Sequence, residues 1–118
     1  MDLSNEIKIA KDVRKNSYSP YGKYLVGCAL KAKSGKIYSG CNIENNGIQS
    51  ICAERVAFAK AISEGEKTFE HIVVCGGSTL DNLDNCLPCG YCRQFMNEFV
   101  DESFKIYGLS ENDVITEY

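Results

Sequence analysis

The sequence predicts an α/β domain in which helices cover a mixed sheet, as a sandwich of two or three layers. Helical and strand-like segments follow one another in the order α-β-β-α-β-α-β, which is typical of this class. The composition, with 44% hydrophobic and 25% charged residues, is that of an ordinary globular protein. Because 118 residues suffice for one domain and are too few for two, we expect residues 1–118 to form a single domain.

The first half of the chain is expected to contain one helix and one hairpin. Residues 3–15 predict an amphipathic helix, and the apolar positions at helical spacing are Leu3, Ile7, Ala10 and Val13–Arg14. Turn-forming residues at 17–22 end this helix. Residues 24–32 and 36–41 are apolar runs joined by Lys33-Ser34-Gly35, which favours a β-hairpin. The polar residues 42–50 are expected to form a loop.

The second half is expected to add two helices and two strands. Residues 51–63 are rich in alanine and other helix formers, so a helix is predicted. Residues 71–75 form a short β-branched run that is typical of a buried strand. A third helix is predicted over 89–100 and a further strand over 104–108. The segment 115–118 is too short to assign.

The charge and the cysteine content narrow the classes of function that the sequence allows. The formal net charge of −3 and the pI of about 5.1 disfavour a nucleic-acid-binding surface and suit a small neutral substrate. No stretch reaches the roughly 18 apolar residues of a membrane span. The first ten residues lack a signal-peptide core, so we expect a cytoplasmic protein with reduced thiols. Seven cysteines there indicate metal binding rather than disulfides.

Three of these cysteines are candidate metal ligands at predicted helix starts. Cys89 and Cys92 form a Cys-x-x-Cys pair within Pro88-Cys89-Gly90-Tyr91-Cys92-Arg93-Gln94, and Cys52 opens the preceding helix. The partial positive charge at a helix N-terminus favours the thiolate that binds metal. Three protein ligands leave the fourth tetrahedral position of zinc to water, which is the mark of a catalytic site.

Glu54 and Arg55 complete this constellation. Glu54 follows Cys52 too closely to be a comfortable ligand, and its carboxyl group can instead exchange a proton with the metal-bound water. Three thiolates and one Zn²⁺ sum to −1, so we expect Arg55 to donate hydrogen bonds to the ligand sulfurs. Cys-Ala-Glu followed by Pro-Cys-x-x-Cys matches the zinc-deaminase signature in its all-cysteine form.

From about Tyr18 to Tyr107 the chain resembles the cytidine deaminase family, in its short homotetrameric branch. The resemblance rests on Tyr18-Ser19-Pro20-Tyr21, Val26-Gly27, Asn42-Ile43-Glu44-Asn45 and the two cysteine segments. It implies an α/β/α sandwich with a mixed central sheet and one zinc ion per subunit between two helix N-termini. The implied ligands are Cys52, Cys89 and Cys92, with Glu54 as the catalytic acid/base. The implied reaction is deamination of cytidine or 2′-deoxycytidine in pyrimidine salvage.

The same resemblance implies five substrate contacts. Asn42 and Glu44 would form hydrogen bonds with the ribose hydroxyls, and Tyr24 would lie against the pyrimidine ring, where the family usually has phenylalanine. The backbone of Ala53 would contact the edge of the base, and the carbonyl of Leu87 would hold the exocyclic amine. The sequence departs from the family in two loops. The 42–52 loop is one residue shorter and carries Asn46-Gly47-Ile48-Gln49 in place of Ala-x-Tyr-Gly, and the loop before Pro88 is a few residues longer.

Several alternatives remain open at this point. Related enzymes deaminate cytosine-containing antibiotics or modified nucleosides. A structural zinc module would use Cys86 as a fourth ligand and give Glu54 no task. An iron–sulfur site at Cys86, Cys89 and Cys92 would leave the Cys-Ala-Glu segment unexplained. His71, the single histidine, is expected to have a structural or surface role rather than to bind metal.

Overall fold

The structure is a computed structural model that describes residues 2–47, 49–84, 90–111 and 114–117, with only the backbone for residues 90–93. Helices and strands alternate as the sequence predicts. In chain order they are α1 (Ser4–Val13), a 3₁₀ turn (Arg14–Asn16), β1 (Leu25–Ala32), β2 (Ile37–Cys41), α2 (Ala53–Ser63), β3 (Phe69–Gly77), α3 (Gly90–Asn97), β4 (Lys105–Ser110) and β5 (Val114–Glu117).

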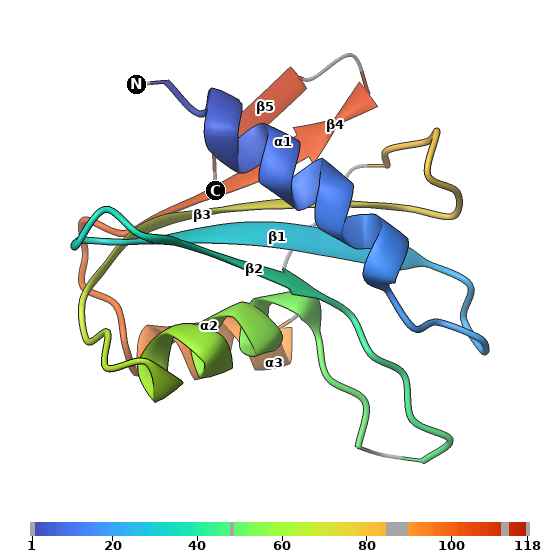
Figure 1. Cartoon of the computed structure of the whole chain (residues 1–118), viewed down its shortest axis with the longest axis horizontal. Helices are drawn as coiled ribbons and strands as arrows, with labels where there is room; N and C mark the ends of the chain where they lie inside the picture. Colours follow the sequence, from blue (N-terminus) through green and yellow to red (C-terminus); the bar gives the residue numbers. More distant parts are fainter. Residues whose placement is uncertain (1, 48, 85–89, 112–113, 118) are drawn as a thin grey trace.

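The strands form one five-stranded mixed sheet in the order β2-β1-β3-β4-β5. β3 and β4 run parallel, and the other neighbouring strands are antiparallel. Helix α1 covers one face of the sheet, and α2 and α3 cover the other (Figure 1). The predicted α/β/α sandwich with a mixed central sheet is therefore confirmed.

The core lies on both faces of the sheet because side chains of a strand alternate in direction. On β1, Cys28 and Leu30 face α2, whereas Ala29 faces α1. Phe58 of α2 is fully buried and lies at the centre of an aromatic cluster. Its ring centroid is 4.9 Å from that of Phe69, and it also contacts Phe95, Phe99 and Phe104. This cluster holds α2 and α3 together against the sheet.

Two glycines allow helices to touch the sheet backbone directly. A β-carbon at Gly27 would overlap the carbonyl oxygen of Ala10 in α1, and one at Gly40 would overlap the carbonyl oxygen of Ala53 in α2. The two glycines belong to neighbouring cross-strand pairs, Gly27 with Cys41 and Cys28 with Gly40. Helices α1 and α2 thus contact the sheet backbone from opposite faces at neighbouring positions. The contact at Gly40 fixes where α2 begins.

Several element bounds differ from the sequence prediction: the helix predicted over 51–63 begins at Ala53, the strand predicted over 71–75 spans Phe69–Gly77, and the strand predicted over 104–108 spans Lys105–Ser110. Three further elements differ as well. The first helix ends earlier and continues as the 3₁₀ turn Arg14–Asn16. Helix α3 ends at Asn97, because the Phe99 amide bonds the Met96 carbonyl at 2.9 Å and tightens the last turn. β5 was not predicted, since four residues give too little pattern; it is a strand because it pairs with β4 along one sheet edge.

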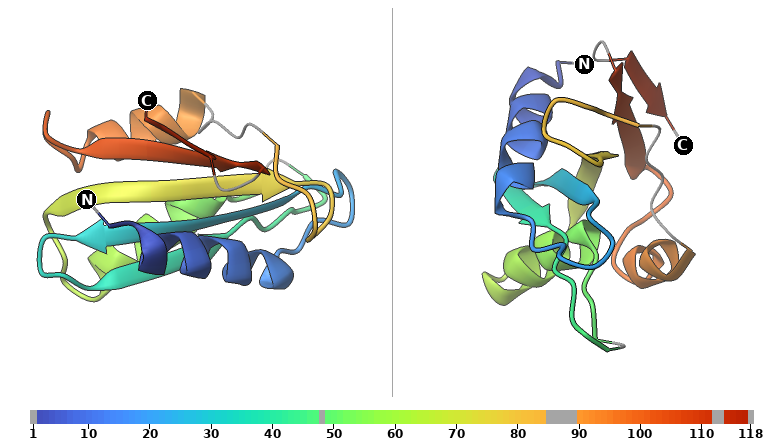
Figure 2. Two further views of the ribbon diagram at one scale, coloured as in Figure 1. Left: turned by 90° about the horizontal axis from the view of Figure 1, so that it is seen from above. Right: turned by 90° about the vertical axis from the view of Figure 1, so that its right-hand side faces the viewer.

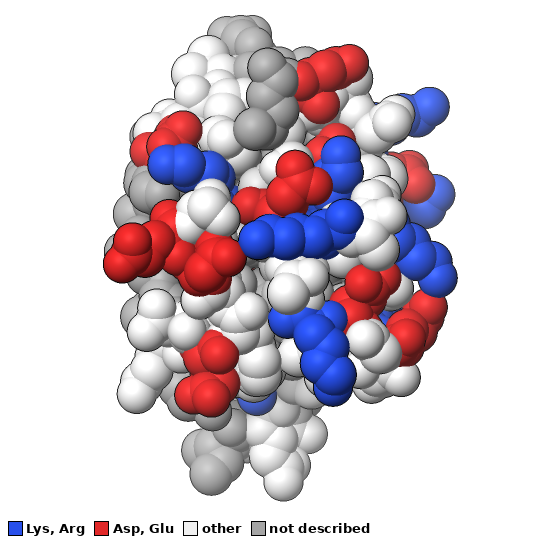
Figure 3. All heavy atoms as spheres, turned by 90° about the vertical axis from the view of Figure 1, so that its left-hand side faces the viewer, with Lys and Arg blue, Asp and Glu red and all other residues white. Residues whose placement is uncertain are grey.

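α2 and α3 run in the same direction along their face of the sheet (Figure 2), so both helices begin at the same end of the molecule. The start of β1 and the ends of β2 and β3 lie at that end as well. The opposite end carries interspersed acidic and basic side chains (Figure 3), including the pairs Lys33–Asp101 at 3.1 Å and Lys36–Glu64 at 2.8 Å. Within the described residues, every helix is too short or too polar to cross a bilayer.

His71 is buried and structural, as expected. Its Nε2 lies 2.5 Å from Oε2 of Glu6, and both residues are 3% exposed. The imidazole also meets the ring of Tyr107 edge-on, with centroids 5.8 Å apart. Because Glu6 belongs to α1 and His71 to β3, this buried pair ties α1 to the centre of the sheet.

We expect Glu6→Gln to lower the free energy of unfolding by about 1–3 kcal/mol, the usual worth of a buried hydrogen bond with a charged group. The amide keeps the shape of the side chain and weakens the contact with His71. Urea unfolding followed by circular dichroism measures the change. An exposed carboxylate on the same helix, Asp12, gives the matched control Asp12→Asn, which should change stability by no more than about 0.5 kcal/mol. Equal effects of the two variants would contradict the prediction.

Candidate active site

Glu54 is a buried acid in the first turn of α2. Only 3% of the residue is exposed, and this burial raises its pKa from the usual 4.5 to about 7. Negative charge on Cys52 adds a smaller increase. A carboxyl group whose pKa lies near physiological pH can both accept and donate a proton there. Glu54 therefore has the electrostatic environment of a general acid/base.

Cys52 lies next to this acid as the N-cap residue of α2, with an extended backbone and a half-buried side chain. Contacts with the sheet hold the first turn of α2 in place. The thiol of Cys28 donates a hydrogen bond of 3.3 Å to the carbonyl of Ala53, and burial raises the pKa of that thiol well above its usual value. Gly40 lets the same carbonyl rest on β2. The positions of Cys52, Ala53 and Glu54 are thus set by the sheet.

The cysteine residues at the starts of α2 and α3 are of a type that binds a divalent metal ion. The N-terminus of a helix favours the thiolate form of a nearby cysteine, and the thiolate is the form that binds zinc. α3 begins at Gly90, so Cys92 lies in its first turn, on a helix that packs beside α2. Cys89 lies outside the described residues, as does the side chain of Cys92, so the ligand set stays a prediction.

Arg55 connects the two helices at this end. Its Nη1 donates a hydrogen bond of 3.5 Å to the carbonyl of Ser50, and its guanidinium carbon lies 5.9 Å from the ring centroid of Phe95 in α3. Of the expected bonds to the ligand sulfurs, those to Cys89 and Cys92 involve side chains outside the described residues, and the whole set stays a prediction.

Asn42 extends the pairing of β1 and β2 with its side chain. Its Oδ1 accepts a hydrogen bond from the Val26 amide at 3.0 Å, and its Nδ2 donates one to the Tyr24 carbonyl at 2.8 Å. The amide group is thereby fixed against the start of β1. One hydrogen on Nδ2 and one lone pair on Oδ1 remain for a ligand.

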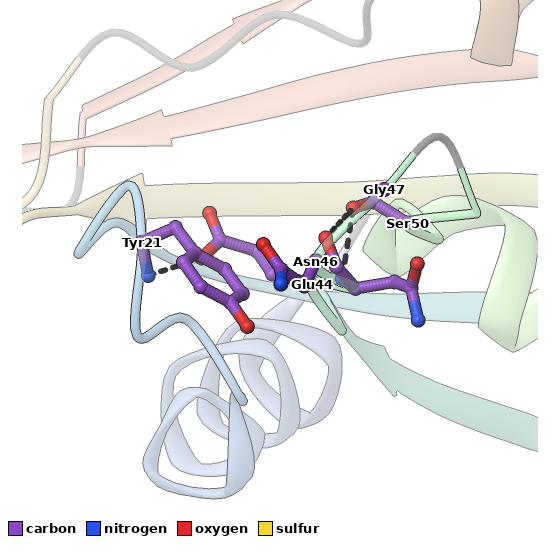
Figure 4. A pocket seen from close by; sticks show the side chains of 6 residues that line it. Tyr21, Glu44, Asn46, Gly47 and Ser50 are labelled. Atoms are coloured by element: carbon purple, nitrogen blue, oxygen red, sulfur yellow. Dashed lines mark hydrogen bonds between the residues drawn. The ribbon is translucent and has the colours of Figure 1, made fainter.

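Glu44 is held as an anion by backbone amides of the 19–22 turn. Its Oε1 accepts hydrogen bonds from Tyr21 at 2.8 Å and Gly22 at 3.0 Å, and these bonds lower the pKa of the carboxyl group. Beside it lies an open pocket of about 370 Å³ (Figure 4). Glu44 lies there between Tyr21 and the 45–50 loop. The structure therefore places a fixed hydrogen-bond acceptor beside an open surface pocket.

Tyr24 directly precedes β1, and hydrogen bonds hold both its backbone amide and its side-chain hydroxyl. Its amide donates to Oγ of Ser19 at 3.0 Å, and its hydroxyl donates to Oδ2 of Asp84 at 3.2 Å. Asp84 was not identified from the sequence, because an isolated aspartate in a polar loop has no distinguishing pattern. Leu87, the other predicted contact near this loop, lies outside the described residues.

A buried carboxylic acid two residues after the N-cap cysteine of α2, on a three-layer α/β/α fold, matches the arrangement of the zinc-deaminase class of hydrolytic enzymes. The comparison with known families agrees. The family model described as "Cytidine and deoxycytidylate deaminase zinc-binding region" matches residues 2–107. The chain belongs to this family of cytidine and deoxycytidylate deaminases.

Individual relatives support the same assignment. The chain is 43% identical over 108 residues to a cytidine deaminase of Sporosarcina psychrophila, covering 91% of this chain and 76% of that protein. It is 34% identical over 87 residues to a blasticidin-S deaminase of Bacillus cereus, covering 70% and 62%. The crystal structure of a cytidine deaminase from Burkholderia pseudomallei superposes with a TM-score of 0.86 at 31% identity, covering 100% of this chain and 92% of that one.

Proposed function

We propose that the protein hydrolyses cytidine and 2′-deoxycytidine to the corresponding uridines and ammonia. The observation that carries this proposal is the buried carboxyl group of Glu54, with a pKa of about 7, beside Cys52 at the start of α2. Relatives named cytidine deaminase at 43% identity favour this reaction over antibiotic deamination, for which the relative is 34% identical. A structural zinc module would leave Glu54 unexplained.

One zinc ion per subunit would be held by Cys52, Cys89 and Cys92. When bound, zinc acidifies a water molecule and so makes it a nucleophile at neutral pH. Glu54 would accept one proton of the attacking water and give it to N3 of the cytosine, while the water oxygen bonds to C4. Glu54 would then move the second water proton to the exocyclic nitrogen, so that the C4–N bond breaks and ammonia leaves.

The remaining residues would bind and orient the nucleoside. Asn42 and Glu44 would bond the ribose hydroxyls, since hydrogen bonds to the backbone fix both side chains and Glu44 lines the open pocket. The ring of Tyr24 would pack against the pyrimidine. The backbone amide of Ala53, which lies at a helix start, would contact the base edge. The carbonyl of Leu87 would hold the amine.

We also propose an oligomeric state and a cellular role for the protein. Aromatic and aliphatic side chains are exposed around the site, and they include Tyr18, Tyr21, Ile43 and Ile51. The backbone bridges Tyr18–Ile43 and Ile43–Ile51 bring three of them together. Exposed apolar surface of this kind supports a homotetramer that covers it. We further propose a single domain over residues 1–118, a cytoplasmic location, a role in pyrimidine salvage, and no nucleic-acid or membrane partner.

A substrate panel tests the proposed function. Protein of known metal content is incubated with cytidine, 2′-deoxycytidine, cytosine and blasticidin S, and uridine formation is followed by absorbance and ammonia release. We expect turnover of both nucleosides, weak activity on cytosine, loss of activity on chelation and recovery with zinc. Turnover of blasticidin S alone, or activity unaffected by complete zinc removal, would overturn the proposal.

Glu44→Gln should raise KM for cytidine about 10-fold or more while kcat changes little, because a hydrogen bond from a sugar hydroxyl to a charged acceptor is lost. Steady-state kinetics with cytidine measures both constants. Glu64→Gln is the matched control, since Glu64 is a carboxylate paired with Lys36 at the opposite end of the sheet. A fall in kcat with unchanged KM would assign Glu44 to the chemical step instead.

A further inference from the structure

Arg14 is a fully buried cation that the proposed chemistry does not use. The residue is 1% exposed at the end of α1. Its Nε donates to the carbonyl of Leu25 at 2.9 Å, and its Nη2 donates to the carbonyls of Thr79 at 2.6 Å and Asn82 at 3.0 Å. Burying a charge costs free energy unless hydrogen bonds replace its hydration. Arg14 meets that cost by bonding two segments, the start of β1 and the 78–84 loop, which the pairing of Leu25 with Gly77 already brings close together.

The second of these segments, the 78–84 loop, is itself closely folded. Oδ1 of Asn82 accepts from the Ser78 amide at 2.9 Å, and the Asp84 amide donates to the Gly76 carbonyl at 2.8 Å. A β-carbon at Gly77 would overlap the backbone of Asn82. The loop is therefore closed by its own hydrogen bonds, and the two bonds from Arg14 tie its backbone to the end of α1 beside the start of β1.

This loop contacts the proposed substrate-binding wall. Asp84 accepts the Tyr24 hydroxyl on Oδ2 at 3.2 Å and the Asn82 side-chain amide on Oδ1 at 3.1 Å. Tyr24 directly precedes Leu25, whose carbonyl Arg14 holds. The contacts form a closed circuit from Arg14 through Leu25, Tyr24, Asp84 and Asn82 back to Arg14.

We propose that Arg14 is a positioning residue for the deamination reaction, which fixes the 78–84 loop so that Asp84 orients the ring of Tyr24. This inference rests on the proposed function, in which Tyr24 packs against the pyrimidine. Arginine suits the task because its planar guanidinium presents several donors in fixed directions. Lysine, a flexible point charge, cannot hold three carbonyls in the same geometry.

Arg14→Lys tests the proposal with cytidine kinetics and zinc quantification. We expect KM to rise about 3- to 10-fold, the equivalent of one lost hydrogen bond, with kcat changing less than about 2-fold and the zinc content unchanged. The matched control is Glu6→Gln, which also weakens a buried polar contact of α1 but lies far from the site. At a temperature where both variants are folded, Glu6→Gln should leave KM unchanged.

Asp84→Ala provides a second variant, because Asp84 is exposed and its removal does not endanger folding. It should raise KM to a similar extent, since it breaks the same link to Tyr24. The double variant of Arg14→Lys and Asp84→Ala should be no worse than the more severe single variant. Unchanged KM in Asp84→Ala, independent effects in the double variant, or an equal rise of KM in Glu6→Gln would each overturn the proposal.

Amide hydrogen exchange separates this proposal from the proposed function. In Arg14→Lys the amides of Ser78 and Asp84 should exchange faster than in the wild type, whereas in Glu6→Gln they should not. This readout requires no activity. If the wild type failed to deaminate cytidine, the proposed function would fall while faster exchange in Arg14→Lys still supported the fixing of the loop. Unchanged exchange in Arg14→Lys would overturn the role of Arg14 even in an active enzyme.

Discussion

Glu54→Gln should lower kcat for cytidine by about 10²–10⁴-fold, the range that general acid/base catalysis contributes. Glutamine has nearly the same size as glutamate but cannot take a proton from water and return it to the substrate. The 3% exposure of Glu54 means that bulk water has poor access to replace this function. Rapid-mixing or long-incubation assays of uridine formation cover the expected range of rates.

Metal content distinguishes this loss from a damaged metal site. We expect Glu54→Gln to retain zinc at the wild-type level, because Glu54 is proposed to act on the water and not as a ligand. Cys52→Ser is the companion variant, and it should lose both zinc and activity. Loss of zinc from Glu54→Gln would show that Glu54 is a ligand, and wild-type kcat would remove it from the mechanism.

Phe58→Ala should lower the free energy of unfolding by about 3–5 kcal/mol, the usual cost of emptying a buried aromatic position. Phe58 is fully buried and its ring contacts four other phenylalanine rings from β3, α3 and the segment before β4. Because this ring joins α2 to α3, zinc affinity should fall together with stability. Urea unfolding and competition with a chromophoric chelator measure the two effects.

A conservative variant provides the control for this prediction. Phe58→Leu fills most of the same volume with an apolar side chain, so the loss of stability should be clearly smaller than for alanine. An exposed alanine of the same helix, Ala59, gives the second control Ala59→Ser, which should change stability by no more than about 0.5 kcal/mol. A loss below 1 kcal/mol for Phe58→Ala would mean that the cluster does not support the two helices.

The sequence predicts the order of most helices and strands because each of these elements has a distinctive local composition or spacing. Residues 24–32 and 36–41 are short apolar runs joined by a glycine turn, and residues 51–63 are rich in helix formers. Two short cysteine segments, at Cys52 and at Cys89, predict the family in the same way, since their spacing is seldom found outside it. Local pattern is sufficient for these features.

The buried polar contacts could not be predicted, because they depend on which side chains meet in space. Glu6 and Ala10 form the buried stripe of α1, and Arg14 continues it into the 3₁₀ turn, yet a hydrophobicity pattern assigns a charged residue such as Glu6 to the solvent. Their partners, His71 and the 78–84 loop, lie more than sixty residues away. The contact of Tyr24 with Asp84 is equally distant in sequence.

The direct contact of two helices with Gly27 and Gly40 sets the distance between the layers at these two points. Where main chain rests on main chain, that distance does not depend on the rotamer of a side chain. The start of α2, and with it Glu54, is therefore held at a fixed height above the sheet. The loops at 42–50 and 78–84 can diverge on this frame, so substrate choice can evolve while the reacting groups stay in place.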